Sequence, residues 1–290
     1  MQLLLQIILS SLVYSLIGLS FSVIYSTLGF FHLAHAISLT LGGYLVYSGV
    51  ILLGWPFWVT VPLSVALVAL LMLAVNGWVY YPLKIKGLAS WQMMIASLGI
   101  YVVLQNVISM VWGDSTLSFR TWEVKVGHNI MGAYITDVQI ITIVTCLALL
   151  ALMWLFMEKT TIGKQVKAVS SNPNLSGILG LSKDRVIMWG VGIGTALVAV
   201  AGILIAADTD MTPTMGFNWL LYGVVALTVG GLGKIRYLVL GALILATAQH
   251  LAAFYLDSKW MNATAYIILI VFLYFRPYGF SGKQLKKSSL

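Results

Sequence analysis

The chain has 290 residues, of which 60% are hydrophobic and 8% carry a formal charge. A soluble domain carries about 25% charged residues, so this composition excludes a soluble globular protein and predicts an integral membrane protein. The net charge of +8 does not indicate a nucleic-acid partner, because the basic residues are spread over short segments between apolar runs. The single cysteine, Cys146, excludes a disulfide framework, and no Cys/His spacing indicates a metal site.

Apolar runs define the predicted elements. A membrane-spanning helix needs about 20 mostly apolar residues, and backbone inside lipid must hydrogen-bond to itself. The sequence therefore predicts an all-α membrane protein, a polytopic helical bundle of about eight or nine transmembrane helices forming one permease-like domain over residues 1–290. The predicted spans are 3–28, 36–54, 57–80, 91–112, 138–157, 186–206, 217–232, 238–256 and 262–276.

Residues 29–36, between the first two predicted spans, are too apolar for an ordinary loop and contain His32 and His35. A tight cytoplasmic turn here would give nine spans and an outside N-terminus. A break inside the membrane would give about eight spans and an inside N-terminus, and irregular backbone at that depth is tolerated only where it lines protein or a water-filled cavity. Both alternatives stay open, because no Lys, Arg, Asp or Glu before Lys84 fixes the side.

Charge asymmetry orients the later spans. Loops rich in Lys and Arg stay in the cytoplasm. Assigning residues 84–86, 159–185, 234–236 and the tail after Tyr274 to that side places 13 of the 16 basic residues there. The opposite side keeps six of the eight acids and the longest outside loop, 113–137. Two of these acids, Asp208 and Asp210, have no base near them in the sequence. They are interpreted as ordinary solvated acids, with a site for a basic patch on a soluble partner as the alternative.

The interior segment 158–185 is too polar to span a membrane. Thr160 or Thr161 can cap a short helix over about 162–170, and Asn172-Pro173 is a second helix start, with Asn as N-cap and Pro at the first helical position. Gly180 is a plausible helix stop. Two short helices would form a docking surface, whereas a solvated basic loop would only set the topology, and the pattern fits both.

Several catalytic and energy-coupling motifs are missing from the sequence. No Walker A pattern is present, so the chain cannot bind and hydrolyse ATP in that way. No acid lies in the middle of a predicted span, where ion-coupled carriers often place one. There is no HExxH motif and no Ser/His/Asp grouping at a recognisable spacing. The residues therefore indicate a passage driven by a separate cytoplasmic motor acting through segment 158–185.

Several motifs, in order along most of the chain, resemble the LivH-like permease subunits of ABC importers for branched-chain amino acids and related amides. In that family, a cytoplasmic coupling loop fits a groove on the ATPase subunit. The resembling segments are Tyr80–Lys84, Leu104–Asn106, Thr161–Ala168, Asn172–Leu181, Val229–Gly233, Gly241–Ala242 and Phe275–Gly282. The resemblance implies ATPase-coupling residues at Thr161, Gly163, Lys164, Lys167, Ala168, Asn172, Pro173, Asn174, Leu175 and Gly180.

The resemblance also implies a substrate pathway. Its candidate residues are His35, Ala34, His32, Gln105 and Asn106. A histidine satisfied within the bundle and amides that join helices by hydrogen bonds are the alternative readings. Adjacent positions lie about 100° apart on a helix, so only one of the two amides is expected to face the pathway. The family's Asn-Phe-Ala-His-Gly segment is His32–Ala36 here, so amides, urea or another small polar solute stay open as substrates.

By this resemblance, the chain is expected to be the permease of an importer in the cell inner membrane, a multi-pass subunit with a cytoplasmic C-terminus. Its expected partners are two cytoplasmic ATPase subunits, a second permease subunit or a second copy of itself, a periplasmic or lipid-anchored binding protein, and membrane lipid. No enzyme activity, cofactor or metal is expected in this chain, and ATP-Mg would bind to the partner subunits. An ion-coupled secondary transporter and a non-transporting membrane scaffold are the competing hypotheses.

Overall fold

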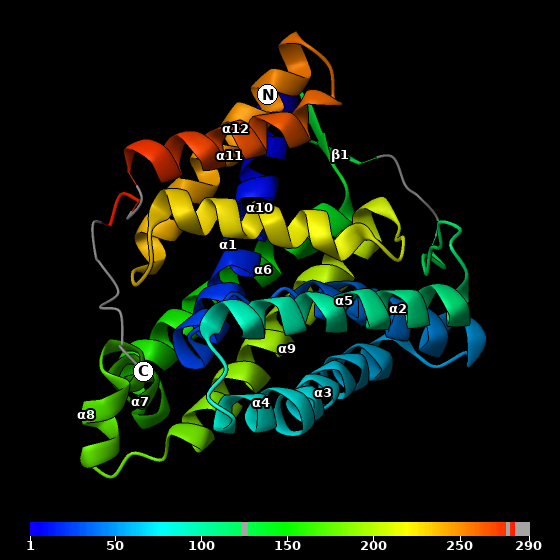
Figure 1. Ribbon diagram of the computed structural model, residues 1–290. Coiled ribbons are helices and arrows are strands. Elements are labelled where there is room, and N and C mark those ends of the chain that lie inside the picture. The colour runs from blue at the N-terminus through cyan, green and yellow to red at the C-terminus, as the bar shows by residue number, and fades with distance from the viewer. Residues whose placement is uncertain (123–126, 131, 277–278, 282–290) are drawn as a thin grey trace. The chain divides into compact units, whose positions relative to one another are not determined.

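The computed structural model describes residues 1–122, 127–130, 132–276 and 279–281, and most of this part is helical (Figure 1). Apolar runs form the long helices, as expected where the backbone has no water to bond to. Two π-helical segments, Ser48–Leu52 and Asn76–Tyr80, extend α2 and α3. The helices are α1 (Gln2–Leu28), α2 (His35–Tyr47), α3 (Phe57–Val75), α4 (Tyr81–Ile85), α5 (Ser90–Trp112), α6 (Asp137–Lys159), α7 (Thr161–Ser171), α8 (Pro173–Ile178), α9 (Lys183–Thr209), α10 (Met215–Gly230), α11 (Ile235–Tyr255) and α12 (Trp260–Phe275).

Seven helical stretches in the described part are long and apolar enough to cross a membrane. They are α1, α2 with its π-helical extension, α3 continued through α4, α5, α6, α9 and α11. Helices α10 and α12 are apolar but shorter, at 16 residues each. Each of the nine predicted spans thus corresponds to one apolar helix, and the predicted all-α, multi-pass architecture is confirmed.

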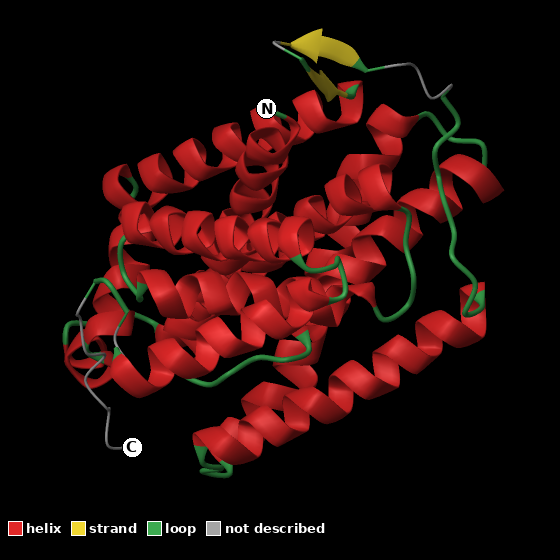
Figure 2. Ribbon diagram, turned by 90° about the horizontal axis from the view of Figure 1, so that it is seen from above, coloured by secondary structure: helices red, strands yellow, loops and turns green. Residues whose placement is uncertain are grey.

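A short antiparallel hairpin lies within the predicted outside loop 113–137 (Figure 2). Its strands are β1 (His128–Ile130) and β2 (Ala133–Ile135), with Asn129 opposite Tyr134. The side-chain amide of Gln2 donates to the Tyr134 carbonyl at 3.1 Å and accepts from the Tyr134 N–H at 2.9 Å. The sequence analysis did not predict this hairpin, because three-residue strands are too short to show an alternating pattern.

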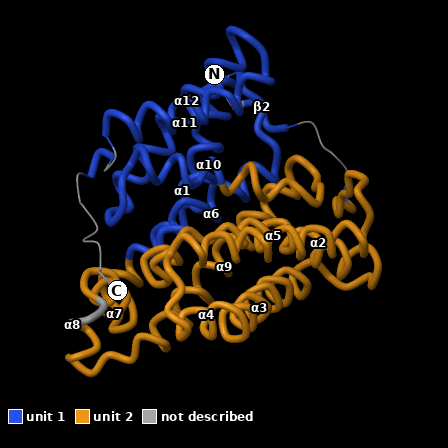
Figure 3. The backbone as a smooth tube through the Cα atoms, in the orientation of Figure 1, with its two compact units in different colours: residues 1–22, 122–154, 221–285 blue, residues 23–121, 155–220, 286–290 orange. Residues whose placement is uncertain are grey.

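The helices group into two compact units, each assembled from segments that are distant in sequence (Figure 3). Three of the boundaries fall inside α1, α6 and α10, so neither unit is a continuous stretch of chain. Unit 1 comprises residues 1–22, 122–154 and 221–285, and unit 2 comprises residues 23–121, 155–220 and 286–290.

Helix α9 forms the centre of unit 2 and packs against α2, α3 and α7. Glycines allow α2 and α9 to approach closely. A Cβ at Gly202 would overlap the carbonyl of Leu39, and a Cβ at Gly42 would lie 2.7 Å from the carbonyl oxygen of Ala199. Small residues at a helix interface are a common way to pack helices in lipid, where no hydrophobic force drives them together.

Unit 1 uses the same kind of contact. A Cβ at Gly18 of α1 would lie 2.7 Å from the Gly223 carbonyl oxygen of α10, and a Cβ at Gly230 would overlap the Tyr237 carbonyl of α11. After α12, the chain returns to the end of α10, where the Phe280 N–H donates to the Val229 carbonyl at 3.0 Å. Small residues therefore set the helix spacing in both units.

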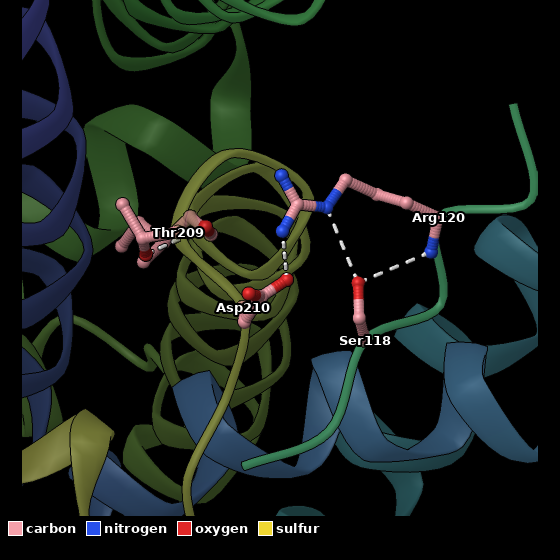
Figure 4. Close-up of polar contacts among 5 residues, drawn as sticks. Ser118, Arg120, Thr209 and Asp210 are labelled. Atoms are coloured by element: carbon pink, nitrogen blue, oxygen red, sulfur yellow. Dashed lines mark hydrogen bonds and ion pairs between the residues drawn. The ribbon is translucent and has the colours of Figure 1, made fainter. Parts of the chain in front are cut away.

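A segment after α5 is fastened to the connection between α9 and α10 in unit 2. Leu117 and Met211 exchange two backbone hydrogen bonds of 3.0 Å, and Phe119 beside them is fully buried. Arg120 then pairs with Asp210 (Figure 4). Asp210 thus has a basic partner that is distant in sequence and becomes a neighbour only in the fold, while its side chain stays partly solvated.

Candidate functional site

The polar segment between α6 and α9 folds into two capped helices, α7 and α8. The Thr160 hydroxyl accepts a hydrogen bond from the Gly163 N–H at 3.0 Å, and the Asn172 side-chain oxygen accepts one from the Leu175 N–H at 3.0 Å. Each cap satisfies a backbone donor that has no partner within its helix. After α8, Gly180 adopts φ +78°, a left-handed conformation that suits glycine at a helix end. The predicted pair of helices is confirmed, with boundaries within two residues of those expected for α7.

Helix α7 is held against its neighbours by one apolar face. Val166 and Val169 are buried and pack with Val186 of α9 and Met157 of α6. Gly163 is also buried, and a Cβ there would overlap the Phe156 carbonyl. Gly163 therefore fixes the α6–α7 junction and is not available to a docking partner.

The opposite face of α7 is exposed. Four residues predicted to couple to an ATPase lie there and are exposed, namely Thr161, Lys164, Lys167 and Ala168. The Lys167 ammonium forms an ion pair of 2.6 Å with the Glu158 carboxylate near the end of α6. This face is thus basic and partly fixed in position by its own ion pair.

Helix α8 exposes apolar side chains on a polar loop. Ile178 is 83% exposed, Leu179 is 70% exposed, and Leu175 is also exposed. Contiguous exposed apolar residues rimmed by polar ones mark interaction sites. The sequence analysis named Leu175 but missed Ile178 and Leu179, although their apolar character in a polar segment was a usable signal. The predicted Asn172 caps this helix, and the side chains of Pro173 and Asn174 lie outside the described residues.

The histidine segment forms a buried turn between α1 and α2. Helix α1 ends at Leu28, and α2 begins at His35. The side chains of His32, Ala34 and His35 are all buried, and the two imidazole rings lie 6.1 Å apart between centroids. The edge of the His32 ring meets Tyr80, at 5.0 Å between centroids.

Two polar features distinguish this turn. The Nδ1 atom of His32 is buried and has no hydrogen-bond partner among the described residues. Ser97 of α5 contacts the turn, since its hydroxyl accepts from the Leu33 N–H at 3.0 Å. Two carbonyls share the single hydroxyl proton of Ser97, that of Met94 in α5 at 2.8 Å and that of Phe31 in the turn at 3.3 Å. An unpartnered buried imidazole atom is costly in a packed bundle and therefore needs an explanation, which makes this turn a candidate functional site.

The two amides predicted for the pathway lie elsewhere on α5. The Gln105 amide donates to the Ser109 hydroxyl at 3.3 Å, and the Asn106 amide donates to the Val102 carbonyl at 2.7 Å. Asn106 is exposed and Gln105 is partly exposed, whereas the residue that α5 supplies to the histidine turn is Ser97. The structure therefore brings His32, Ala34 and His35 together but does not bring the amides to them.

The described residues contain no group of three His, Cys, Asp or Glu side chains that could hold a metal ion. Two geometric features remain as candidates for function. One is the exposed face of α7 and α8, and the other is the buried histidine turn.

Comparison with known proteins identifies the family. The family model described as branched-chain amino acid transport system / permease component matches residues 3–275. The chain is 26% identical over 283 residues to the high-affinity branched-chain amino acid transport system permease protein LivH of Salmonella typhimurium, covering 93% of this chain and 91% of LivH. It is 25% identical to the corresponding BraD protein of Pseudomonas aeruginosa, covering 93% of this chain and 92% of BraD.

A solved structure, described as PsaBC from Streptococcus pneumoniae in complex with Fab, shares the fold. Its TM-score is 0.54 at 14% sequence identity, covering 96% of this chain and 93% of that one. The family match extends over nearly the whole chain and agrees with the order of the apolar helices. The chain thus belongs to the family of branched-chain amino acid transport system permease components, and it is the multi-pass membrane permease of an ABC importer that works with ATPase and substrate-binding partners.

Proposed function

We propose that this permease moves branched-chain amino acids, or related small polar solutes such as amides and urea, across the cell inner membrane. The relatives LivH and BraD are named as branched-chain amino acid permeases, which supports this substrate class. Two ATPase subunits would bind ATP-Mg on the cytoplasmic side, and a second permease subunit or a second copy would complete the pathway. A periplasmic or lipid-anchored protein would deliver the solute, and the C-terminus would lie in the cytoplasm.

The observation that carries this proposal is the capping of α7 and α8 and the packing of α7 on the neighbouring helices. Force from an ATPase reaches the spans only if the contacting element is stiff and joined to them. Both helices have side-chain N-caps, and α7 is packed on α6 and α9 through Val166, Val169 and Gly163. The exposed apolar residues Ile178 and Leu179 supply a contact that a groove on an ATPase subunit can bury.

In this mechanism, closure of the ATPase pair pushes on α8 and α7. The push reaches α9 through the contact of Val166 and Val169 with Val186. Helix α9 packs on α2, whose first residue is His35 of the histidine turn. A shift of α9 would therefore change the surroundings of the turn, which gives the proposed coupling a continuous physical route within unit 2.

The test is co-purification of the tagged permease from its native membrane, with mass spectrometry of the accompanying proteins. We expect an ATPase subunit with the wild type and its loss in Ile178→Asp with Leu179→Asp, because two charges would enter an apolar contact. The matched control is Ser182→Asp, which adds charge to an exposed position of the same segment. A substitution at Gly163 is unsuitable, since it would disturb the α6–α7 junction itself.

The outcomes separate the competing hypotheses. If no ATPase co-purifies with the wild-type permease, and vesicles that contain the purified permease without ATPase subunits still accumulate solute, the chain works as an ion-coupled carrier. If the ATPase is retained in the double variant, the docking face lies elsewhere than on α8.

A further inference from the structure

Unit 2 contains a cavity of about 280 Å³ where α3 runs into α4 and faces the first turns of α9. Most of its wall is apolar, with Leu73 and Ile187 on opposite helices. Its size approaches the lower end of the range of ligand pockets, which begins near 300 Å³. Five lining residues carry polar groups: Asn76, Tyr80, Tyr81, Lys84 and Asp184.

The cavity has one cationic and one anionic wall. Lys84 of α4 and Asp184 of α9 both line it, and the Asp184 carboxylate acts electrostatically on the Lys84 ammonium. No ion pair within 4 Å joins the two among the residues that the structure describes. Both charges thus remain available to a ligand that carries a positive and a negative group a few bonds apart.

Two of the polar residues that line the cavity are buried. Tyr80 is 2% exposed, and its hydroxyl has no hydrogen-bond partner among the described residues. Asn76 is buried beside it, and the π-helical segment Asn76–Tyr80 carries both residues. Single π-helical turns inside α-helices occur frequently at functional sites. Because Tyr80 also lines the cavity, a polar ligand bound there would supply the partner that the Tyr80 hydroxyl lacks.

The surroundings of the cavity are those of a membrane interface. Trp78, Tyr81 and Trp189 are large aromatic side chains that the structure leaves exposed; Tyr81 lines the cavity, and the two tryptophans are neighbours in sequence of lining residues. Trp and Tyr concentrate where the hydrocarbon of a bilayer meets the head groups. Lys84 and Lys86, which belong to the basic side of the chain, follow in the same segment. These residue types are the ones that would place the mouth of the cavity among lipid head groups.

We propose that this cavity binds the head group of a phospholipid with a primary ammonium, as in phosphatidylethanolamine. The phosphate would lie against Lys84, the ammonium against Asp184, and the glycerol and first acyl carbons along the apolar wall. An anionic lipid without an ammonium would meet the Asp184 carboxylate as a like charge. A choline head group has no N–H to donate to that carboxylate. This lipid site does not depend on the transported solute or on the ATPase contact.

Native mass spectrometry of the delipidated permease, purified with the subunits that accompany it, tests the proposal. Dioleoyl phosphatidylethanolamine, phosphatidylcholine and phosphatidylglycerol would be titrated separately, and the bound lipid counted. We expect the ethanolamine lipid to bind most tightly to the wild type. Lys84→Gln should weaken it about fivefold, which corresponds to about 1 kcal/mol for the loss of one exposed charge contact.

Three further variants sharpen the result. Asp184→Asn should remove the preference for ethanolamine over glycerol head groups without abolishing binding. Lys84→Arg should retain binding, which separates lost charge from lost folding. Lys86→Gln is the matched control, because Lys86 does not line the cavity.

Equal binding of the three lipids to the wild type would overturn the proposal. So would an equal loss of ethanolamine-lipid binding in Lys86→Gln and Lys84→Gln. Free leucine that binds through Lys84 and Asp184, with no lipid effect in the variants, would also overturn it and would make the cavity a solute site.

Discussion

Arg120 and Asp210, 90 positions apart in the sequence, form an ion pair that fastens the segment after α5 to the end of α9. The backbone of Asp210 is strained, with φ 65° and ψ −178°. This region of conformational space is essentially restricted to glycine and costs other residues about 1–3 kcal/mol. The pair itself is partly solvated, with side chains 27% and 31% exposed, so it contributes about 0.2–1 kcal/mol.

Asp210→Gly should therefore be more stable than Asp210→Ala, because glycine relieves the strain whereas alanine keeps it and both lose the ion pair. We expect the free energy of unfolding of the glycine variant to exceed that of the alanine variant by about 1 kcal/mol. Thermal unfolding in detergent measures the difference, with Arg120→Ala as the control that removes the pair, and with it the Arg120 side-chain hydrogen bond to Ser118, while leaving the Asp210 backbone unchanged. An alanine variant at least as stable as the glycine variant would contradict the strain at this position.

The contact between Gly202 of α9 and the Leu39 carbonyl of α2 predicts that position 202 does not tolerate even a methyl side chain without loss of stability. Gly202→Ala should cost about 1–3 kcal/mol through overpacking, because the added Cβ has no space unless the helices move apart. Gly192→Ala in the same helix meets only the Leu73 methyl groups, at 3.8 and 4.0 Å, and should be neutral or stabilising by up to about 1 kcal/mol. Thermal unfolding of the two variants side by side checks this, and equal effects would show that close approach does not limit position 202.

Local signals explain what the sequence could predict. The helix boundaries at Thr160 and Asn172 depend on caps within three residues, and the apolar spans depend on continuous runs, so both are readable from short windows. The Ser97 contacts with Leu33 and Phe31 join residues that lie 64 and 66 positions apart in the sequence, and such long-range contacts cannot be predicted from composition. For the same reason, sequence reasoning chose Gln105 and Asn106 from α5, whereas the residue that meets the histidine turn is a serine two turns earlier.

The α7 cap offers a graded test of the proposed coupling. Thr160→Ala removes the acceptor of the Gly163 N–H and should cost about 1 kcal/mol, which loosens the start of α7. We expect the ATPase still to co-purify, because the α8 contact is intact, while solute-stimulated ATP hydrolysis falls. Thr160→Ser keeps the hydroxyl and should restore stimulation. Equal stimulation in all three proteins would mean that stiffness at this junction is not needed for coupling.

His32 allows packing and function to be separated in one residue. Its Nδ1 is buried without a partner, and its ring packs on Tyr80. His32→Phe preserves the ring while removing the unsatisfied atom, whose burial costs about 1–3 kcal/mol. If the histidine turn lines the solute pathway, this variant should be more thermostable than the wild type yet lose at least about tenfold in solute uptake, since functional sites are retained at the expense of stability.

Thr195→Val is the matched control for this experiment, because Thr195 also buries an unpartnered hydroxyl in unit 2 but is not among the predicted pathway residues. It should gain stability and retain uptake. Uptake measured in cells, alongside co-purification of the ATPase, distinguishes a blocked pathway from a lost complex. His35→Trp should also block uptake with the ATPase still bound, since the side chain at position 35 is fully buried in the same turn. Normal uptake in both histidine variants would assign the turn to packing alone and place the pathway elsewhere in the permease.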